Sequence, residues 1–283
     1  MSGAVWINGE WTDRIDPLDR GFTLGDGVFD TLTAFNRTPF AGAEHLARLV
    51  GQAASIGISI DADTIRKGWD AMLARGGESV ILRTTVTRGV SGRGLWPATQ
   101  PTPTIAVSAA PWDRAVLGKE VRLVTSTIVR NPASPSSRLK TLGYLDHVLA
   151  AREAAERDGD DALFQNTAGH LACTTIANFF AIAGDQLLTP PVEDGVMPGI
   201  VRAMLLRLAP SAGLEARERS LTTQELAGAD AVFLTNSVRL LSPVGSLDAK
   251  TLSRRGAAAE TALRDALAAA VREECGFNIA ASR

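Results

Sequence analysis

Short runs of apolar and β-branched residues mark the first third of the chain. Val5-Trp6-Ile7 and Trp11-Thr12 flank an Asn8-Gly9 turn signal, a pattern typical of a short hairpin. Residues 28–35, 79–87 and 104–109 predict three further strands. Residues 44–56 predict a helix. This part of the chain is therefore expected to be α+β.

The remainder alternates predicted helices and strands. Residues 120–129 predict a strand, 131–137 an irregular loop, and 140–157 a helix, so Lys140 is expected where the loop becomes the helix. Residues 161–167 and 174–184 are interpreted as paired strands joined by a turn around Ala168-Gly169. Later helices are predicted at 199–208 and 254–274, with a strand at 231–235.

The pattern loosens between residues 110 and 119, around Pro111. This favours an N-terminal α/β domain over residues 1–112, a linker over 113–119 and a C-terminal domain over 120–283. An irregular stretch of this length is also compatible with an ordinary loop. The chain of 283 residues is long enough for two domains or for one large one.

Composition and charge exclude several classes of protein. A net charge of −2 without a polybasic run excludes the electrostatic footprint of a nucleic-acid binder. The two cysteines form no CxxC pair and the three histidines are scattered, so neither a disulfide scaffold nor a metal site is expected. No apolar run is long enough to cross a membrane and no secretory signal is seen, so we expect a cytoplasmic protein.

Several strings in order along the chain carry a resemblance. They are LGDGVFDTL at 24–32, HLARL at 45–49, RNPASPSSRLKTLGYLDHVLAARE at 130–153, NFF at 178–180 and FLTNS at 233–237. Together they resemble the fold type IV enzymes that use pyridoxal 5'-phosphate (PLP), the class IV aminotransferase family. The resemblance covers nearly the whole chain. It implies an α+β fold with a smaller N-terminal α/β domain and a larger C-terminal PLP-binding domain.

Lys140 is the residue to which the resemblance assigns the Schiff base with PLP. A lysine where a helix starts is by itself usually a solvated surface residue. The assigned chemistry needs a neutral amine, which a partly desolvated site or a neighbouring positive charge favours. The same amine can then move the substrate's α-proton as a general base.

The resemblance also assigns residues that would hold the cofactor. Arg48 matches the phosphate arginine, and the phosphate cup is matched by the helix start at Gly199 and Ile200 with Thr235 and Asn236. Without the resemblance, Arg48 would be interpreted as a helix-surface charge and residues 235–237 as a polar turn. Two further cofactor residues are implied, Asn178 and Tyr144, and the alternative for the tyrosine is packing on its helix.

Arginines are the residues expected to bind a substrate carboxylate. Arg93 and Arg88 lie in the glycine-rich segment VTRGVSGRGLWP, and Arg93 is the preferred ligand. Arg88 is alternatively expected to pair with an acid at a strand end, and Arg138 is a weaker candidate. The GDGVF segment matches neither a Walker loop nor a GxGxxG fingerprint, so nucleotide binding there is rejected.

Cys173 departs from the family pattern. It stands five residues before Asn178, where the resemblance leads us to expect a glutamate that keeps the pyridine nitrogen of PLP protonated. A thiol cannot stabilise a pyridinium as a carboxylate does, so transamination should suffer more than elimination. The alternative is that Cys173 is merely buried and that another group supplies the acid.

Three functions follow from the resemblance. The first is a 4-amino-4-deoxychorismate lyase that releases pyruvate and 4-aminobenzoate, favoured by RGVSGRG, by VFLTNS and by Thr31, which matches a threonine proposed to assist proton transfer. Tyr144 and Leu95-Trp96 depart from the lyases. The second is an aminotransferase of D-amino or branched-chain acids, and the third a PLP-binding scaffold with degenerate activity. The family also implies a homodimer acting on an amino-acid or amino-carboxylate substrate.

Overall fold

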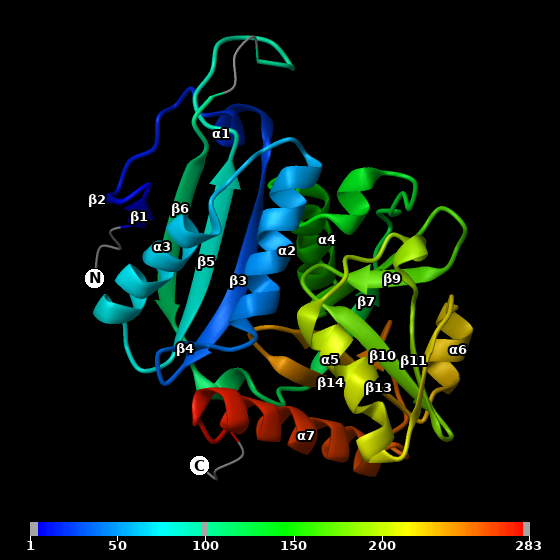
Figure 1. The fold of residues 1–283 in the computed structure, drawn as a ribbon. Coiled ribbons are helices and arrows are strands. Elements are labelled where there is room, and N and C mark those ends of the chain that lie inside the picture. The colour runs from blue at the N-terminus through cyan, green and yellow to red at the C-terminus, as the bar shows by residue number, and fades with distance from the viewer. Residues whose placement is uncertain (1–4, 98–100, 280–283) are drawn as a thin grey trace. The chain divides into compact units, whose positions relative to one another are not determined.

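In a computed structural model that describes residues 5–97 and 101–279, the chain forms two units (Figure 1). Unit 1 comprises Met1–Trp112, Leu139–Gly143 and Glu273–Phe277. Unit 2 comprises Asp113–Arg138, Tyr144–Arg272 and Asn278–Arg283. Each unit contains its own sheet.

Unit 1 is built on a six-stranded sheet in the order β2-β1-β6-β5-β3-β4. The predicted hairpin is confirmed, because β1 and β2 pair across Asn8-Gly9, where both residues have positive φ. The predicted strands are confirmed as β3, β5 and β6. The strands of this sheet are β1 (Val5–Ile7), β2 (Glu10–Thr12), β3 (Gly27–Phe35), β4 (Thr38–Pro39), β5 (Val80–Thr87) and β6 (Thr104–Pro111).

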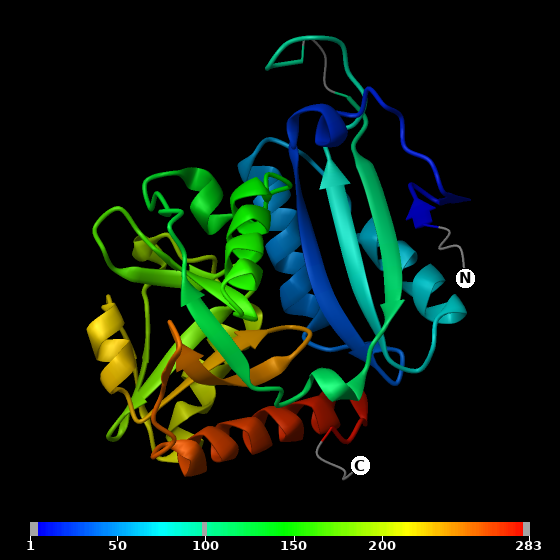
Figure 2. The same cartoon turned by 180° about the vertical axis from the view of Figure 1, so that it is seen from behind.

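Helices α2 (Gly42–Ser55) and α3 (Ala62–Arg75) cover one face of this sheet, as both views show (Figures 1 and 2). The apolar side of α2 packs on β3 and that of α3 packs on β6, β5 and β1, and alternate residues of β3, such as Val28 and Leu32, belong to the same buried cluster. The sequence reading predicted α2 but missed α3 and the short α1 (Arg20–Leu24).

Residues 139–143 form part of unit 1 because they pair with the start of β3. The carbonyl of Lys140 accepts from the amide of Phe29 at 2.8 Å, and the amide of Leu142 donates to the carbonyl of Gly27 at 3.0 Å. A side chain at Gly27 would place its Cβ 2.3 Å from a carbonyl oxygen of β5. The predicted helix at 140–157 is therefore wrong at its start: α4 begins only at Leu145, since the backbone of 140–142 is committed to β3.

Unit 2 contains a sheet in the order β12-β11-β10-β13-β14-β7-β8-β9, with β15 paired to β14. The strand predicted at 231–235 is confirmed as β13. The strands are β7 (Val121–Thr125), β8 (Asp161–Gln165), β9 (Leu171–Thr174), β10 (Asn178–Ala183), β11 (Gln186–Thr189), β12 (Glu215–Glu218), β13 (Ala231–Asn236), β14 (Leu240–Leu247) and β15 (Lys250–Thr251).

The predicted pairing of residues 161–167 with 174–184 is wrong. β8 pairs with β9, and β10 pairs instead with β11 and β13. The turn after Asn166 is tight, because the amide of Asn166 donates to the carbonyl of His170. The next strand, β9, therefore runs straight back along β8. The edge of β8 is then occupied, and β10 pairs with other strands.

Four α-helices belong mainly to unit 2, and α6 was not predicted from the sequence. α4 contacts β7 and β8, and α5 contacts β12 and β13. The helices are α4 (Leu145–Glu156), α5 (Ile200–Leu208), α6 (Thr223–Gly228) and α7 (Ala257–Cys275). The last residues of α7 lie in unit 1.

The residues predicted as a linker, 113–119, belong to unit 2 and include a short 3-10 helix at Arg114–Val116. Lys140 was assigned to the C-terminal domain and lies instead in unit 1, for the pairing reason given above. Among the described residues, no helix is long and apolar enough to span a membrane.

Candidate active site

Lys140 lies beside the aromatic ring of Phe29. Its Nζ is 4.3 Å from the centroid of that ring, and the guanidinium of Arg83 is 3.7 Å from the same centroid. The amide of Lys140 donates to Oε1 of Gln52 on α2 at 3.0 Å. The backbone of Lys140 is thus bonded to β3 through its carbonyl and to α2 through its amide. Its amine lies against the aromatic ring of Phe29 and is not surrounded by water alone.

Thr31 shares the face of β3 that carries Phe29, because side chains two apart on a strand point the same way. It is half-buried and stands in register with Arg83 on β5. This alternation places Thr31 and Phe29 on one side of β3, and Asp30 on the other.

Asp30 forms a buried network with two residues of α2. Its carboxylate accepts from Nδ1 of His45 at 2.6 Å and from Nε and Nη2 of Arg48 at 2.8 and 3.0 Å. Although burial raises the pKa of Asp30, the hydrogen bond from His45 and the charge of Arg48 hold it below its ordinary value. Arg48 is therefore oriented by a carboxylate, which the interpretation as a plain surface charge did not anticipate.

Arg88 pairs with an acid, as one of its two alternatives predicted. Its guanidinium makes a two-point contact with Asp26 at 2.8 and 3.0 Å and donates to the carbonyls of residues 56 and 57. Arg88 is 4% exposed. Burial raises the pKa of Asp26, and the bonds from Arg88 and Arg20 lower it to a net value below the ordinary one.

Arg93 lies on an exposed loop whose neighbouring residues are anchored from beneath. Arg20 is 3% exposed and donates to Asp26 and to the carbonyls of Gly94 and Leu95. The side chain of Arg93 itself is exposed. The buried guanidinium of Arg20, paired with Asp26, thus fixes the backbone that follows Arg93.

In unit 2, Asn178, Gly199 and Thr235 lie together. Asn178 and Thr235 are cross-strand partners, and Nδ2 of Asn178 donates to the carbonyl of Met197 at 3.0 Å. A Cβ at Gly199 would stand 2.0 Å from Oδ1 of Asn178. Glycine is needed at position 199 because the asparagine approaches its backbone so closely.

The start of α5 and the end of β13 offer polar groups that suit an anion. Gly199 is the N-cap of α5, and within the described ranges no side chain caps the first turn, which begins at Ile200. Oγ1 of Thr235 is buried without a hydrogen-bond partner among the described residues. Asn236 shapes the adjoining turn, because its Oδ1 accepts from the amides of residues 238 and 239. Helix N-termini and hydroxyl donors are the usual ligands of phosphate.

Cys173 is 5% exposed and belongs to an apolar cluster with Phe164, Ala172 and Val196. A buried acid, Asp161, is bonded to the residues that follow Cys173: its Oδ1 accepts from Oγ1 and from the amide of Thr175 at 2.5 and 3.2 Å. Burial raises the pKa of Asp161 despite those bonds from Thr175.

Tyr144 is the N-cap residue of α4, and its ring stacks on His147 with centroids 4.2 Å apart. The predicted helix over residues 140–157 would include both Lys140 and Tyr144, but neither residue lies within α4, which begins at Leu145. Arg138 is exposed, and its Nη2 donates to the carbonyl of Pro132 at 3.3 Å.

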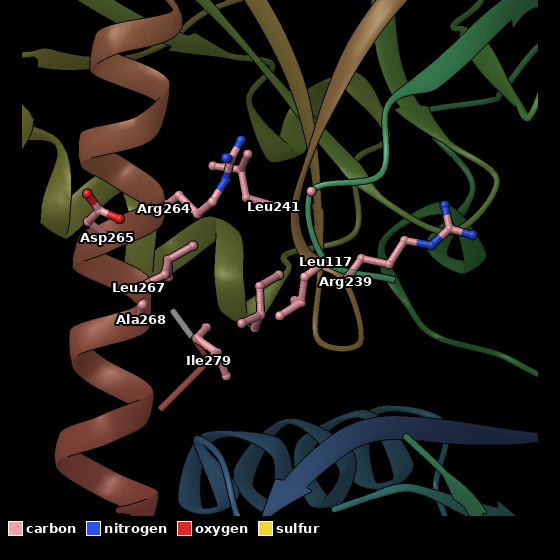
Figure 3. A pocket seen from close by; sticks show the side chains of 10 residues that line it. Leu117, Arg239, Leu241, Arg264, Asp265, Leu267, Ala268 and Ile279 are labelled. Atoms are coloured by element: carbon pink, nitrogen blue, oxygen red, sulfur yellow. The ribbon is translucent and has the colours of Figure 1, made fainter. Parts of the chain in front are cut away.

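A cavity of about 260 Å³ lies in unit 2 (Figure 3). None of the residues that line it was predicted to act in a site, and Figure 3 shows the guanidinium of Arg239 pointing away from Leu267. Its lining residues are Leu117, Gly118, Arg239, Leu240, Leu241, Arg264, Asp265, Leu267, Ala268 and Ile279.

Comparison with known proteins decides the family. The sequence pattern of amino-transferase class IV matches residues 27–247. The chain belongs to the class IV aminotransferase family. Class IV aminotransferases are PLP enzymes, so the chain is an enzyme of a PLP-dependent family of lyases and aminotransferases.

Class IV relatives with two activities are similar to this chain. A putative branched-chain-amino-acid aminotransferase of Methanocaldococcus jannaschii is 30% identical over 89% of this chain and 90% of its own length. The aminodeoxychorismate lyase of Bacillus subtilis is 26% identical over 92% of each chain. A crystal structure of a putative 4-amino-4-deoxychorismate lyase from Legionella pneumophila superposes with a TM-score of 0.85, at 30% identity, over 93% of this chain and 97% of that one. The α+β fold of the class IV family is thereby shown.

The residues present fit PLP. The buried hydroxyl of Thr235 lacks a hydrogen-bond partner among the described residues, the uncapped start of α5 supplies amide donors, and Arg48 has a guanidinium oriented by Asp30. Within unit 2 the hydroxyl and the amide donors suit a phosphate group, and within unit 1 the guanidinium of Arg48 suits one as well. The resemblance assigns the Schiff base to Lys140, whose amine would then bind the cofactor's aldehyde.

Asp30, His45, Arg130 and His147 were not anticipated from the sequence. Two of them leave a signal there, since His45 precedes Arg48 by three residues and His147 follows Tyr144 by three, the spacing of neighbours on a helix face. Asp30 lies 15 residues before His45, and Arg130, whose Nη1 is 3.1 Å from Nε2 of His147, lies 17 residues before that histidine. Neither Asp30 nor Arg130 leaves such a local signal.

Proposed function

We propose that this class IV enzyme is a PLP-dependent lyase that converts 4-amino-4-deoxychorismate to 4-aminobenzoate and pyruvate. The observation that carries the proposal is Cys173, a thiol in an apolar cluster at the position where the family resemblance leads us to expect a glutamate. That position governs how well the pyridine nitrogen holds a proton.

When bound, PLP supplies a sink for the electrons released at the carbon that bears the substrate's amino group. A thiol is a weak hydrogen-bond donor and offers no negative charge to a protonated ring nitrogen. A weaker sink hinders the return of a proton to the cofactor, which transamination requires. Elimination is less affected, because the electron pair leaves with the departing enolpyruvyl oxygen.

Each proposed role belongs to a named residue. The neutral amine of Lys140 takes the proton from the carbon that bears the amino group, the bond to the enolpyruvyl oxygen breaks, and enolpyruvate gains a proton to become pyruvate. Thr31, on the face of β3 shared with Phe29, assists that proton transfer. Arg93 binds a substrate carboxylate.

The remaining proposed site residues hold the cofactor. Arg48 and the phosphate cup, formed by Gly199, Ile200, Thr235 and Asn236, would hold its phosphate, and Tyr144, Cys173 and Asn178 would contact the rest of the cofactor. Arg88 and Arg138 are weaker proposals as substrate ligands than Arg93, because their guanidinium groups already bind Asp26 and the carbonyl of Pro132.

The second candidate is an aminotransferase of D-amino or branched-chain acids. Tyr144 favours it, because the lyases that the chain resembles commonly carry an arginine there. The similarity to the M. jannaschii relative, a putative branched-chain aminotransferase, favours it too. In this alternative Lys140 would carry the proton to the cofactor instead.

A single-turnover experiment separates the candidates. The purified holoprotein is mixed with enzymatically generated 4-amino-4-deoxychorismate and, separately, with D-alanine and L-leucine, with Lys140→Ala as control. The lyase releases 4-aminobenzoate and pyruvate in equal amounts, and Lys140→Ala releases neither. Conversion of the cofactor to its amine form by an amino acid, without 4-aminobenzoate, would establish the aminotransferase instead.

The homodimer implied by the family is also proposed. Unit 1 exposes large apolar side chains along α1 and the loop that carries Arg93, and their exposed fractions reach 69% at Phe22, 86% at Leu95 and 68% at Trp96. Light scattering after gel filtration should give twice the chain mass of 29.8 kDa. A mass of one chain at micromolar concentration would refute it.

A further inference from the structure

Arg130 bonds three different segments of unit 2. Its Nε donates to the carbonyl of Gly195 at 2.6 Å, its Nη2 donates to the carbonyl of Ser137 at 2.6 Å, and its Nη1 lies 3.1 Å from Nε2 of His147. The backbone of Arg130 is itself held on β8, since its amide donates to the carbonyl of Gln165. These contacts hold the guanidinium of Arg130 in one position, and each of its three nitrogens has its own partner.

The partners of His147 determine its tautomer. Nδ1 lies 2.7 Å from the carbonyl oxygen of Thr175, which can only accept, so Nδ1 carries a proton. Nε2 faces the N–H of Arg130, which can only donate, so Nε2 carries none. His147 is therefore a neutral imidazole with the proton on Nδ1, placed between one acceptor and one donor.

Aromatic contacts fix the plane of this imidazole. The ring of Tyr144 stacks on it with an interplanar angle of 14°, and the ring of Phe164 meets it edge to face at 5.2 Å. The guanidinium of Arg130 lies 6.0 Å from the centroid of Phe164. An imidazole held by two hydrogen bonds and two rings has a single orientation. Because the ring of Tyr144 stacks on it, the imidazole also fixes the plane of the tyrosine ring.

The same imidazole holds the segment between Cys173 and Asn178. Thr175 is bonded from two sides: its carbonyl accepts from His147, and its hydroxyl and amide donate to the buried Asp161. The fork of Arg130 also holds the carbonyls of Ser137 and Gly195, which lie three residues before Lys140 and four before Gly199. The segments that carry or adjoin most of the proposed cofactor residues are therefore bonded to one pair of side chains, His147 and Arg130.

We propose that His147 and Arg130 form a positioning pair, which orients the ring of Tyr144 and the Cys173–Asn178 segment for the cofactor. The inference rests on the proposed site residues. It assigns the pair no proton transfer and no contact with the substrate. The pair acts through Tyr144 and Thr175, so its loss should change how the cofactor is held.

Three variants of His147 separate its contacts. His147→Asn keeps a donor that can reach the carbonyl of Thr175, His147→Gln keeps an acceptor for Arg130, and His147→Phe keeps only the ring that stacks on Tyr144. Arg130→Lys removes the fork, and Arg122→Lys is its control, because Arg122 is exposed and pairs with Asp160 on the surface.

The readouts are the PLP dissociation constant, the visible circular dichroism of the bound cofactor and the melting temperature of the apoprotein. We expect His147→Phe and Arg130→Lys each to raise the dissociation constant about tenfold, and to weaken the visible dichroism, whereas Arg122→Lys does neither. His147→Asn should retain most of the wild-type affinity. Because His147 and Arg130 share one bond, the double variant His147→Phe with Arg130→Lys should raise the constant by much less than the product of the single effects.

Nitrogen-15 NMR of the wild-type imidazole tests the geometry without any variant. The expected spectrum has Nδ1 protonated and Nε2 unprotonated, and the reverse assignment would overturn the proposal. Unchanged affinity and dichroism in both His147→Phe and Arg130→Lys, or effects that simply multiply, would also overturn it. A wild-type protein that binds no PLP would instead refute the proposed function, and the positioning role with it.

Discussion

The two units hold their proposed site residues by different physical means. In unit 1 the arginines are paired with carboxylates, Arg48 with the buried Asp30 and Arg88 with the partly buried Asp26. In unit 2 the corresponding side chains bind backbone carbonyls, as Asn178 does at Met197. One unit orients charge with opposite charge, and the other orients side chains through hydrogen bonds to backbone carbonyls.

The difference matters for what a substitution does. Removing one member of a buried ion pair leaves the other charge uncompensated in a medium of low polarity, which is costly. Removing a neutral donor to a carbonyl forfeits one hydrogen bond, and the loss is smaller. Substitutions at the ion pairs of unit 1 should therefore lower the stability of the fold, whereas substitutions at the hydrogen bonds of unit 2 should mainly lower the affinity for the cofactor.

The largest effect is expected at Asp30. Asp30→Asn leaves Arg48 and His45 without their carboxylate, so we expect the free energy of unfolding of the apoprotein to fall by about 3 to 5 kcal/mol in urea titrations. The control is Glu156→Gln, which breaks an exposed pair with Arg152 and should cost less than about 0.5 kcal/mol. Equal losses in the two variants would contradict the comparison.

The same carboxylate should make unit 1 sensitive to acid. The folded state holds the pKa of Asp30 below its ordinary value of 3.8, so its stabilisation is complete above that value and is lost as the pH falls through the folded-state pKa. Urea midpoints measured between pH 7 and pH 3 should fall more steeply for the wild type than for Asp30→Asn. Parallel curves would show that Asp30 is not the titrating group.

An intermediate effect is expected at Gly199. In Gly199→Ala the new Cβ would meet Oδ1 of Asn178 at 2.0 Å, so the start of α5 or the asparagine must shift. Overpacking of this kind costs about 1 to 3 kcal/mol, and PLP affinity should fall with it. Gly228→Ala is the matched control, because its Cβ meets nothing within 4 Å, and its stability should be unchanged or slightly higher.

A change of ligand affinity without a change of stability is expected at Thr235. Its hydroxyl has no partner among the described residues, so Thr235→Val should leave the apoprotein as stable as the wild type and lower PLP affinity about tenfold, or 1.4 kcal/mol. Thr189→Val is the opposite case, because that buried hydroxyl donates to the carbonyl of Phe179. It should cost about 1 kcal/mol of stability and leave PLP affinity alone.

The smallest effect is expected at Glu225, an exposed carboxylate of unit 2. The amide of Thr222 and then Arg219 lower its pKa to about 2, so its contribution is present above its ordinary pKa of 4.5 and is lost as the pH falls toward 2. Solvent screening keeps the cost of Glu225→Gln below about 1 kcal/mol in urea titrations. A loss as large as that of Asp30→Asn would show that exposure does not separate the two carboxylates.

Much of the secondary structure could be predicted from the sequence. The hairpin at Asn8-Gly9, strand β3 and helix α2 follow from turn chemistry and from the spacing of apolar residues, which are local properties of the chain. The motif that carries Lys140 identified the family for the same reason. The helix predicted over residues 140–144 was wrong because the apolar spacing gives no information about pairing with a distant strand. The carbonyl of Lys140 accepts from the amide of Phe29 on β3, so this backbone is not helical.

The partners of the polar side chains could not be predicted. Asp30 and Arg48 are 18 residues apart, Asp26 and Arg88 are 62 apart, and His147 and Thr175 are 28 apart. Nothing in the local pattern of either residue marks the other.

The sequence by itself thus determined the family and most of the strands and helices, and it singled out Lys140 as the candidate lysine, because these depend on residue type and short-range spacing. Only the tertiary structure decided that Asp30 orients Arg48, that Arg88 forms an ion pair with Asp26, and that His147 is a neutral donor to Thr175. The physical reason is that ion pairs and hydrogen bonds depend on distances of a few ångströms, which are set by how strands and helices pack.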